Sequence, residues 1–136
     1  MEKLYTAKAT ATGGRNGHVK SENGILDIEV RTPTASGQET YLNPELLFAG
    51  GYAACFDSAL NGVMRAEKVS AGTTSVTAEV SLGKMDNGGY NLEITLEVEV
   101  PGIERAKAEE LVNKAHQVCP YSNATRGNVQ VTLIVK

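Results

Sequence analysis

Two cysteines, Cys55 and Cys119, are the residues of this sequence best suited to chemistry. Cys55 lies in the apolar segment FAGGYAACF, and Cys119 directly precedes Pro120. Because cysteine is among the most buried residue types, two unreactive core cysteines are the simplest interpretation. A zinc site is less favoured, since neither cysteine is part of a CxxC pair and the two histidines, His18 and His116, have no HxxxH spacing.

The setting of Cys119 favours redox chemistry over inert packing. Proline disfavours a helical conformation in the residue before it and suits the first position of a helix, so Cys119 is predicted to cap the segment PYSNAT. The N–H groups at a helix start stabilise a thiolate. Arg15, in the loop GGRNG, would alone be an ordinary solvated charge, but it could supply the cation that a thiolate needs. A cysteine hydrolase with His116 as base is a further alternative, although a histidine facing outward from a helix explains that residue equally well.

The composition is typical of a globular protein and gives no sign of binding to nucleic acid or to a membrane. The chain has 136 residues, 41% of them hydrophobic and 21% charged, and we expect a single domain over residues 1–136. A net charge of -3 provides no basic surface for nucleic acid or an anionic membrane. Since there is no signal-peptide pattern and no apolar run of about 18 residues, we expect a cytoplasmic protein without a membrane partner. In that reducing compartment a transient disulfide is allowed, whereas a permanent one is not expected.

The elements that must position these residues alternate between strands and helices. A period of two predicts strands over six segments: 4–12, 18–21, 25–32, 75–83, 90–100 and 128–136. In the fifth, the inward face is expected to consist of Leu92, Ile94, Leu96, Val98 and Val100. A tight reversal is expected at KMDNGG, between the fourth and fifth strands. Helices that interrupt a largely antiparallel sheet make the predicted fold class α+β.

Two helices are predicted, of very different character. The second, over residues 102–118, is amphipathic, with Ala108, Leu111, Val112 and Ala115 at helical spacing. The first, over residues 43–68, begins with features typical of a helix start: Asn43 as cap, Pro44 in the first position and Glu45 in the first turn.

The first helix is apolar on all sides from Leu46 to Cys55 and should therefore be buried on all sides. Gly50 and Gly51 each cost roughly 1 kcal/mol relative to alanine, which suggests that another backbone approaches closely. A dimer with this helix at its centre explains both features. A monomer with one fully buried core helix is the alternative.

The motifs NPELLFAGGYAACF and VCPYSNATRGN, with the GGRNG loop upstream, resemble the OsmC/Ohr family of bacterial proteins. The resemblance runs essentially from end to end, and CPYSNAT is similar to the organic hydroperoxide resistance branch rather than the OsmC branch. It implies an OsmC-like α+β fold with a buried central helix, in an intertwined homodimer with two active sites at the interface.

The resemblance also implies a thiol peroxidase that needs no metal, haem or flavin cofactor. The cysteine matching Cys55 attacks the peroxide, releases an alcohol and becomes a sulfenic acid, and Cys119 then condenses with it to a disulfide. Arg15 would lower the pKa of Cys55 and polarise the peroxide, while Glu45 would hold the guanidinium through a bidentate pair. The disulfide would be reduced by dihydrolipoamide or a lipoylated protein.

The residues themselves agree with the resemblance except on which thiol is activated. Its place at a helix start would make Cys119 the more reactive thiol, whereas the resemblance implies Cys55. Burial in the middle of a helix raises a thiol pKa, so Arg15 would have to activate Cys55. An apolar surround is expected from Phe48, Tyr52 and Met64. Such a surround suits an alkyl or fatty-acid hydroperoxide, although an OsmC-type enzyme that prefers hydrogen peroxide and a non-enzymatic binding module remain alternatives.

Helix geometry bears on how Arg15 reaches Cys55. In one straight helix Glu45 and Cys55 lie about 15 Å apart along the axis and about 80° apart around it, which is roughly twice the reach of an arginine side chain. Either the helix begins after Glu45, or Arg15 and Glu45 act on Cys55 of the partner subunit. We favour the partner, because the central helix independently predicts a dimer.

Overall fold

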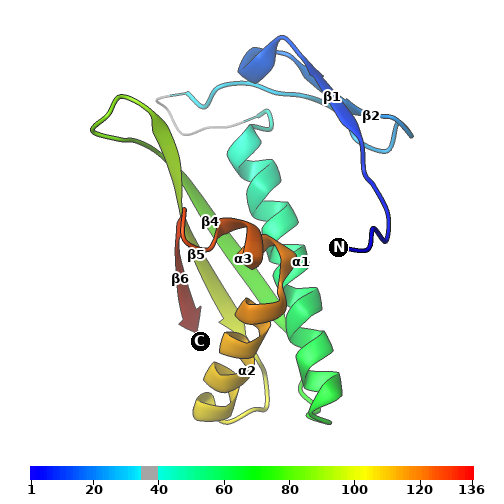
Figure 1. The fold of residues 1–136 in the computed structure, drawn as a ribbon, viewed down its shortest axis with the longest axis vertical. Coiled ribbons are helices and arrows are strands. Elements are labelled where there is room, and N and C mark those ends of the chain that lie inside the picture. Colours follow the sequence, from blue (N-terminus) through cyan, green and yellow to red (C-terminus); the bar gives the residue numbers. More distant parts are fainter. Residues whose placement is uncertain (35–39) are drawn as a thin grey trace. The chain divides into compact units, whose positions relative to one another are not determined.

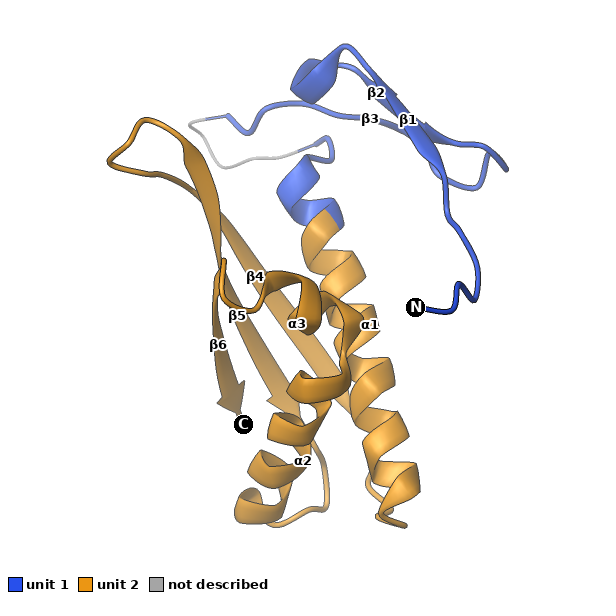
Figure 2. Cartoon of the chain, viewed as in Figure 1, with its two compact units in different colours: residues 1–47 blue, residues 48–136 orange. Residues whose placement is uncertain are grey.

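The computed structural model describes residues 1–34 and 40–136, and its contacts divide the chain into two compact units, Met1–Leu47 and Phe48–Lys136 (Figure 2). The expectation of a single domain over residues 1–136 therefore stays a prediction. None of the helices formed by the described residues is long and apolar enough to cross a membrane.

The first unit contains a small antiparallel sheet. Its strands are β1 (Ala9–Thr12), β2 (His18–Ser21) and β3 (Asp27–Glu29), in the order β1-β2-β3, and a short 3-10 helix, η1 (Gly14–Asn16), connects β1 to β2. The sequence prediction of strands over 4–12 and 25–32 was too long, because β2 offers only four residues for pairing with its neighbours. All four residues of β1 are exposed, so this sheet has no covering layer of its own.

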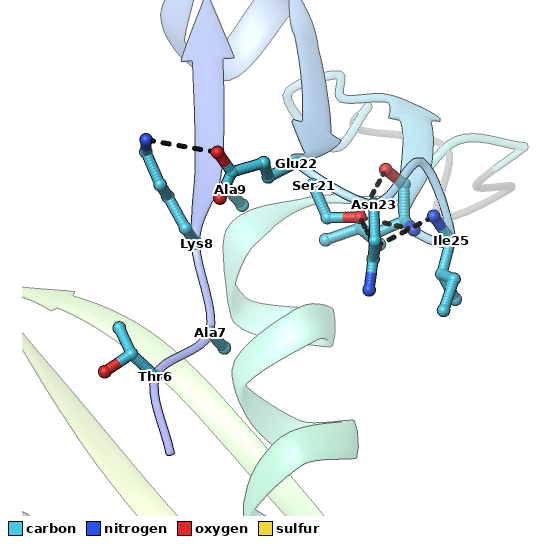
Figure 3. Close-up of a pocket in the computed structure, with 9 residues that line it drawn as sticks. Thr6, Ala7, Lys8, Ala9, Ser21, Glu22, Asn23 and Ile25 are labelled. Carbon is cyan, nitrogen blue, oxygen red and sulfur yellow. Dashed lines mark hydrogen bonds and ion pairs between the residues drawn. The ribbon is translucent and has the colours of Figure 1, made fainter. Parts of the chain in front are cut away.

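An open groove of about 550 Å³ lies beside this sheet, between the N-terminal segment and the turn after β2 (Figure 3). An ion pair between Lys8 and Glu22 spans it, and Ile25, which is 87% exposed, lies on its rim. None of the four predicted site residues lines this groove.

The helix α1 (Pro44–Ala66) begins where the sequence predicts. The side-chain oxygen of Asn43 accepts a hydrogen bond of 2.8 Å from the backbone N–H of Leu46, which confirms the cap. The helix buries one face, formed at every fourth position by Tyr52, Phe56, Leu60 and Met64.

The opposite side of α1 is exposed within one chain. Leu46, Gly50, Ala54 and Ser58 form a stripe of exposed residues at every fourth position, and Leu46 is 50% exposed. The alternative of a monomer with a fully buried central helix is therefore wrong, because the elements that pack on α1 cover only one of its faces, while burial of the other face in a dimer stays a prediction.

The second unit carries the larger sheet, with strands β4 (Ser75–Lys84), β5 (Tyr90–Glu99) and β6 (Gln130–Val135). β4 and β5 are antiparallel and joined by the predicted reversal, with Lys84 opposite Tyr90. The predicted inward face of β5 is confirmed: Ile94, Leu96 and Val98 are completely buried.

The sheet arrangement differs from the prediction in two respects. The strands form two three-stranded sheets rather than one, and β6 lies parallel to β5. A parallel neighbour requires a crossover, which α2 (Arg105–Val118) and α3 (Pro120–Thr125) supply. The predicted core face of α2 is confirmed, since Ala108, Leu111, Val112 and Ala115 are all buried. Figure 1 shows α1 and α2 over the same face of this sheet, and their buried side chains share one core with those of β5.

Candidate active site

The two cysteines, distant in sequence, meet in the second unit. Cys55 lies in the middle of α1 and is half-buried, and Cys119 lies between α2 and α3 and is completely buried. Their Sγ atoms are 3.7 Å apart and both thiols are free. Because a disulfide bond is about 2.05 Å long, an approach of about 1.7 Å would join them.

Pro120 explains where Cys119 lies. The backbone of Cys119 is extended, with φ -63° and ψ 124°, as expected for a residue that precedes proline. This ends α2 and starts α3 at Pro120, so Cys119 is the N-cap residue that the sequence predicted. The break in helical geometry allows α3 to turn across α1 and brings Cys119 to Cys55.

The helix start that was expected to activate Cys119 acts on Cys55 instead. Burial raises the pKa of the Cys55 thiol, while a hydrogen bond from the backbone N–H of Tyr121 lowers it, and the neighbouring Cys119 raises it again. The expectation that burial raises the pKa of Cys55 is therefore confirmed, and the N–H of Tyr121 opposes this rise. The sequence could have predicted the contact between the Tyr121 N–H and Cys55 only by placing Cys55 beside the CPY motif. The spacing of these residues along the chain does not indicate that they are neighbours.

Two aromatic side chains pack around the ring of Tyr121. The Tyr121 ring lies 5.9 Å from the ring of Phe48 and 5.8 Å from that of Tyr52, measured between centroids. Gly51 leaves room for it, because a Cβ atom there would lie 3.1 Å from the Tyr121 hydroxyl oxygen.

The predicted roles of Gly51 and Met64 change accordingly. An aromatic side chain, and not another backbone, approaches Gly51. A Cβ at Gly50 would meet nothing within 4 Å in one chain, so the approach of a second copy there stays a prediction. Phe48 and Tyr52 belong to the aromatic group as expected. Met64 does not, since it lies nine residues beyond Cys55, about 13 Å along the helix axis, and is buried in the core.

A buried polar network lies next to the thiols and was not foreseen from the sequence. Ser122 Oγ is 2.8 Å from the hydroxyl oxygen of Tyr52 and 2.8 Å from Nδ1 of His116. Burial, followed by the charge of Arg126, lowers the pKa of His116. His116 thus contacts Ser122, so the structure does not favour it as a base for Cys119 or as an outward-facing residue. The serine in CPYSNAT was the one available signal.

Arg15 and Glu45 form the predicted bidentate pair in the first unit. The two guanidinium nitrogens of Arg15 donate to the two carboxylate oxygens of Glu45, at 2.8 and 2.7 Å. The hydrogen bond from Arg15 lowers the pKa of Glu45, which favours its ionised form. The Arg15 loop requires glycine, because Gly13 has φ 81° and a Cβ at Gly17 would lie 1.8 Å from the carbonyl oxygen of Thr12.

The start of α1 excludes one of the two interpretations of this pair, and the other, that it acts on the partner's Cys55, stays a prediction. Since the helix begins at Pro44, Glu45 lies within its first turn, and the alternative of a helix that starts after Glu45 is wrong. Cys55 therefore lies ten residues after Glu45 on the same helix, about 15 Å along the axis.

Within residues 1–34 and 40–136, no three His, Cys, Asp or Glu side chains are grouped so as to hold a metal ion. The expectation that the protein needs no metal or other cofactor stays a prediction. What the site offers is a pair of adjacent thiols, one of them touched by a backbone N–H donor, in an aromatic surround. This arrangement is suited to reversible thiol oxidation.

Comparison with known proteins identifies relatives along the whole chain. The family model for OsmC-like protein matches residues 37–134. The organic hydroperoxide resistance protein OhrA of Bacillus subtilis is 52% identical over 136 residues, covering 97% of this chain and 96% of its own. The organic hydroperoxide resistance protein of Xanthomonas axonopodis is 49% identical over 135 residues, covering 96% of this chain and 93% of its own. The crystal structure of an organic hydroperoxide resistance protein from Elizabethkingia anophelis is 57% identical, with a TM-score of 0.94 and coverage of 100% of this chain and 99% of that one. This chain therefore belongs to the OsmC/Ohr family, in its branch of organic hydroperoxide resistance proteins.

Proposed function

We propose that this protein confers resistance to organic hydroperoxides by reducing them to alcohols with its two thiols. The observation that carries the proposal is the 3.7 Å separation of the Cys55 and Cys119 sulfurs, with the backbone N–H of Tyr121 at Cys55. The names of the relatives, organic hydroperoxide resistance proteins at 47–52% identity, support the choice of substrate class.

The reaction proceeds in two steps. The Cys55 thiolate attacks the distal peroxide oxygen, the O–O bond breaks, and the remaining alkoxide leaves as an alcohol, so that Cys55 becomes a sulfenic acid. Cys119 then attacks the sulfenic sulfur, an S–S bond replaces the S–O bond, and the oxygen leaves as water with the proton of the Cys119 thiol. Cys55 is assigned the first step because it is half-buried, whereas Cys119 is completely buried.

The aromatic residues around Cys55 favour an alkyl or fatty-acid hydroperoxide over hydrogen peroxide. Phe48, Tyr52 and Tyr121 present apolar rings with centroids about 6 Å apart, and Tyr121 is 39% exposed. Burial of an alkyl chain against such rings contributes roughly 0.8 kcal/mol per CH₂ group, a gain that hydrogen peroxide cannot have.

The proposal includes a homodimer in which Arg15 and Glu45 of one subunit act on Cys55 of the other. Two features support the dimer: the uncovered sheet of the first unit, and the exposed stripe on α1 formed by Leu46, Gly50, Ala54 and Ser58. A small sheet without a covered face is marginally stable in water, and a second copy would cover it. The distance of about 15 Å between Glu45 and Cys55 along α1 supports the assignment to the partner.

The oxidised protein has to be reduced after each cycle. We propose a dihydrolipoyl dithiol, free or on a lipoylated protein, as the reductant in the cytoplasm. Two electrons from the dithiol open the Cys55–Cys119 disulfide, and the lipoyl group becomes a disulfide in turn.

Stopped-flow measurement of tert-butyl hydroperoxide consumption, with dihydrolipoamide as reductant, tests the proposal. We expect catalytic turnover in the wild type and none in Cys55→Ser. Cys55–Cys119 disulfide formation by peroxide, detected by mass spectrometry, separates an enzyme from a binding module with inert cysteines. Faster turnover of hydrogen peroxide than of tert-butyl hydroperoxide would favour the OsmC-type alternative, and a wild type that consumes neither peroxide would refute the proposed activity.

A further inference from the structure

We propose that Ser122 is a positioning residue for the thiol pair: its hydrogen bonds to Tyr52 and His116 hold the segment that carries Cys119 against α1 and keep the two sulfurs within reach of each other. This proposal deepens the proposed function and rests on it for the role of the disulfide. The brace itself, defined as the contacts that Ser122 makes with Tyr52 and His116, can be tested without any peroxide.

The brace runs parallel to the sulfur contact. Tyr52 precedes Cys55 by three residues on α1, and Ser122 follows Cys119 by three residues in α3. Residues three apart lie on the same side of a helix, about one turn from each other. The contact between the Tyr52 hydroxyl and Ser122 Oγ, at 2.8 Å, therefore joins the same two segments as the sulfurs do at 3.7 Å. A movement of α3 away from α1 would lengthen both distances together.

Burial makes the brace costly to open. Tyr52 and Ser122 are both 0% exposed, so separating them would leave two buried hydroxyl groups without each other as partners. Thr125 Oγ1 donates to the carbonyl oxygens of Tyr121 and Ser122, at 2.9 and 3.2 Å, and lies 3.5 Å from the Tyr52 hydroxyl. Through these contacts, the hydroxyl groups of α3 and the Tyr52 hydroxyl of α1 form one buried polar cluster.

His116 connects the brace to α2. Because burial lowers its pKa, the neutral imidazole can accept a hydrogen bond at Nδ1 from the Ser122 hydroxyl, whose oxygen then accepts from Tyr52. The guanidinium of Arg126, which follows α3, donates to the carbonyl oxygen of His116 at 2.5 Å. Both sides of Cys119 are therefore anchored, α2 through His116 and α3 through Ser122.

The brace should affect the resolving step more than the attack on peroxide. The Cys119 thiol must reach the sulfenic sulfur of Cys55 to form the S–S bond and release water. If α3 is less firmly held, the sulfenic acid persists longer, and a second hydroperoxide oxidises it to a sulfinic acid while it is itself reduced to an alcohol. Loss of the brace thus predicts both a weaker disulfide and more overoxidation of Cys55.

The first test is the equilibrium of the purified protein with reduced and oxidised glutathione, where two glutathione thiols form as one Cys55–Cys119 disulfide forms. Ser122→Ala and Tyr52→Phe are each expected to lower the equilibrium constant about tenfold, which corresponds to about 30 mV for a two-electron couple. The double variant should lose little more than Ser122→Ala alone, because that change already removes the contact that Tyr52→Phe removes. Ser81→Ala, the same change on the exposed surface of β4, should match the wild type.

The second test measures sulfinic acid at Cys55 by mass spectrometry after equal doses of tert-butyl hydroperoxide. Both variants should accumulate it several-fold faster than the wild type and Ser81→Ala. If Ser122→Ala does not fold, Tyr52→Phe still tests the brace, since this variant keeps the aromatic ring in the core. Equilibrium constants within twofold of the wild type in Tyr52→Phe would overturn the proposal. A wild type that equilibrates with glutathione but consumes no peroxide would refute the proposed activity and leave the brace intact.

Discussion

Replacement of Gly50 by alanine tests whether a second copy of the chain covers the exposed side of α1. Within one chain, an added Cβ at Gly50 meets nothing within 4 Å. Alanine in a helix interior is more favourable than glycine by about 1 kcal/mol, so an isolated chain should gain about that much in its free energy of unfolding. Its melting temperature should then rise by about 4 °C.

The proposed dimer reverses this expectation. The exposed stripe on α1 contains small side chains at Gly50, Ala54 and Ser58, which allow another helix to approach closely. An extra methyl group in a well-packed contact costs about 1–3 kcal/mol. We therefore expect Gly50→Ala to lower the stability of the dimer by up to about 2 kcal/mol, once the helix propensity gain is subtracted.

Gly62→Ala is the matched control. Gly62 also lies inside α1, and a Cβ there would meet nothing within 4 Å. It follows Ser58 by four residues, but it is half-buried rather than exposed and lies about 120° around the axis from Gly50. The free energy of unfolding of Gly62→Ala should be higher than that of the wild type by about 1 kcal/mol. Urea denaturation at several protein concentrations, with sedimentation to measure the dimer, distinguishes the two variants. Equal stabilisation of both variants with an unchanged oligomeric state would refute the assignment of this stripe to the interface.

The remaining predictions concern the two thiols, the pair of Arg15 and Glu45, and His116. Cys119→Ser should react once with peroxide and stop at an oxidised Cys55, whereas turnover in Cys55→Ser with a sulfenic acid on Cys119 would reverse their roles. Arg15→Ala should raise the pKa of Cys55 and slow its reaction with peroxide at least tenfold, with partial rescue by lysine, which cannot form the same fork with Glu45; an unchanged thiolate titration would contradict this. A heterodimer of Cys55→Ser and Arg15→Ala chains should recover about half the wild-type activity if sites are shared between subunits, and an inactive heterodimer would exclude sharing. Because burial lowers the pKa of His116, the unfolded chain binds a proton at His116 before the folded chain does as the pH falls. The free energy of unfolding should therefore decrease below about pH 6.5. Urea titrations between about pH 5 and 7.5 should show a smaller decrease in His116→Gln.

Local chemistry made the helices and the central strand of the second sheet predictable. Asn43 and Pro44 define a helix start through one hydrogen bond and one fixed backbone angle, and the structure begins α1 there. The alternation in β5 and the apolar positions of α2 reflect a side-chain period within one element, so their buried faces followed directly. Cys119 was predictable as an N-cap for the same reason, since Pro120 restricts only its immediate neighbour.

Contacts between distant segments were decided only by the tertiary structure. The parallel pairing of β6 with β5 depends on how α2 and α3 cross over the sheet, which no local period reveals. The same crossover brings the N–H of Tyr121 to Cys55 and Ser122 to Tyr52, so a helix start opposes the rise that burial causes in the pKa of a thiol 64 residues away from its own N-cap. The sequence by itself determined which residue types were available for thiol chemistry, through two cysteines and a proline. Which thiol receives the N–H group, and which serine holds the pair together, was decided by packing, because those contacts depend on the register of elements far apart along the chain.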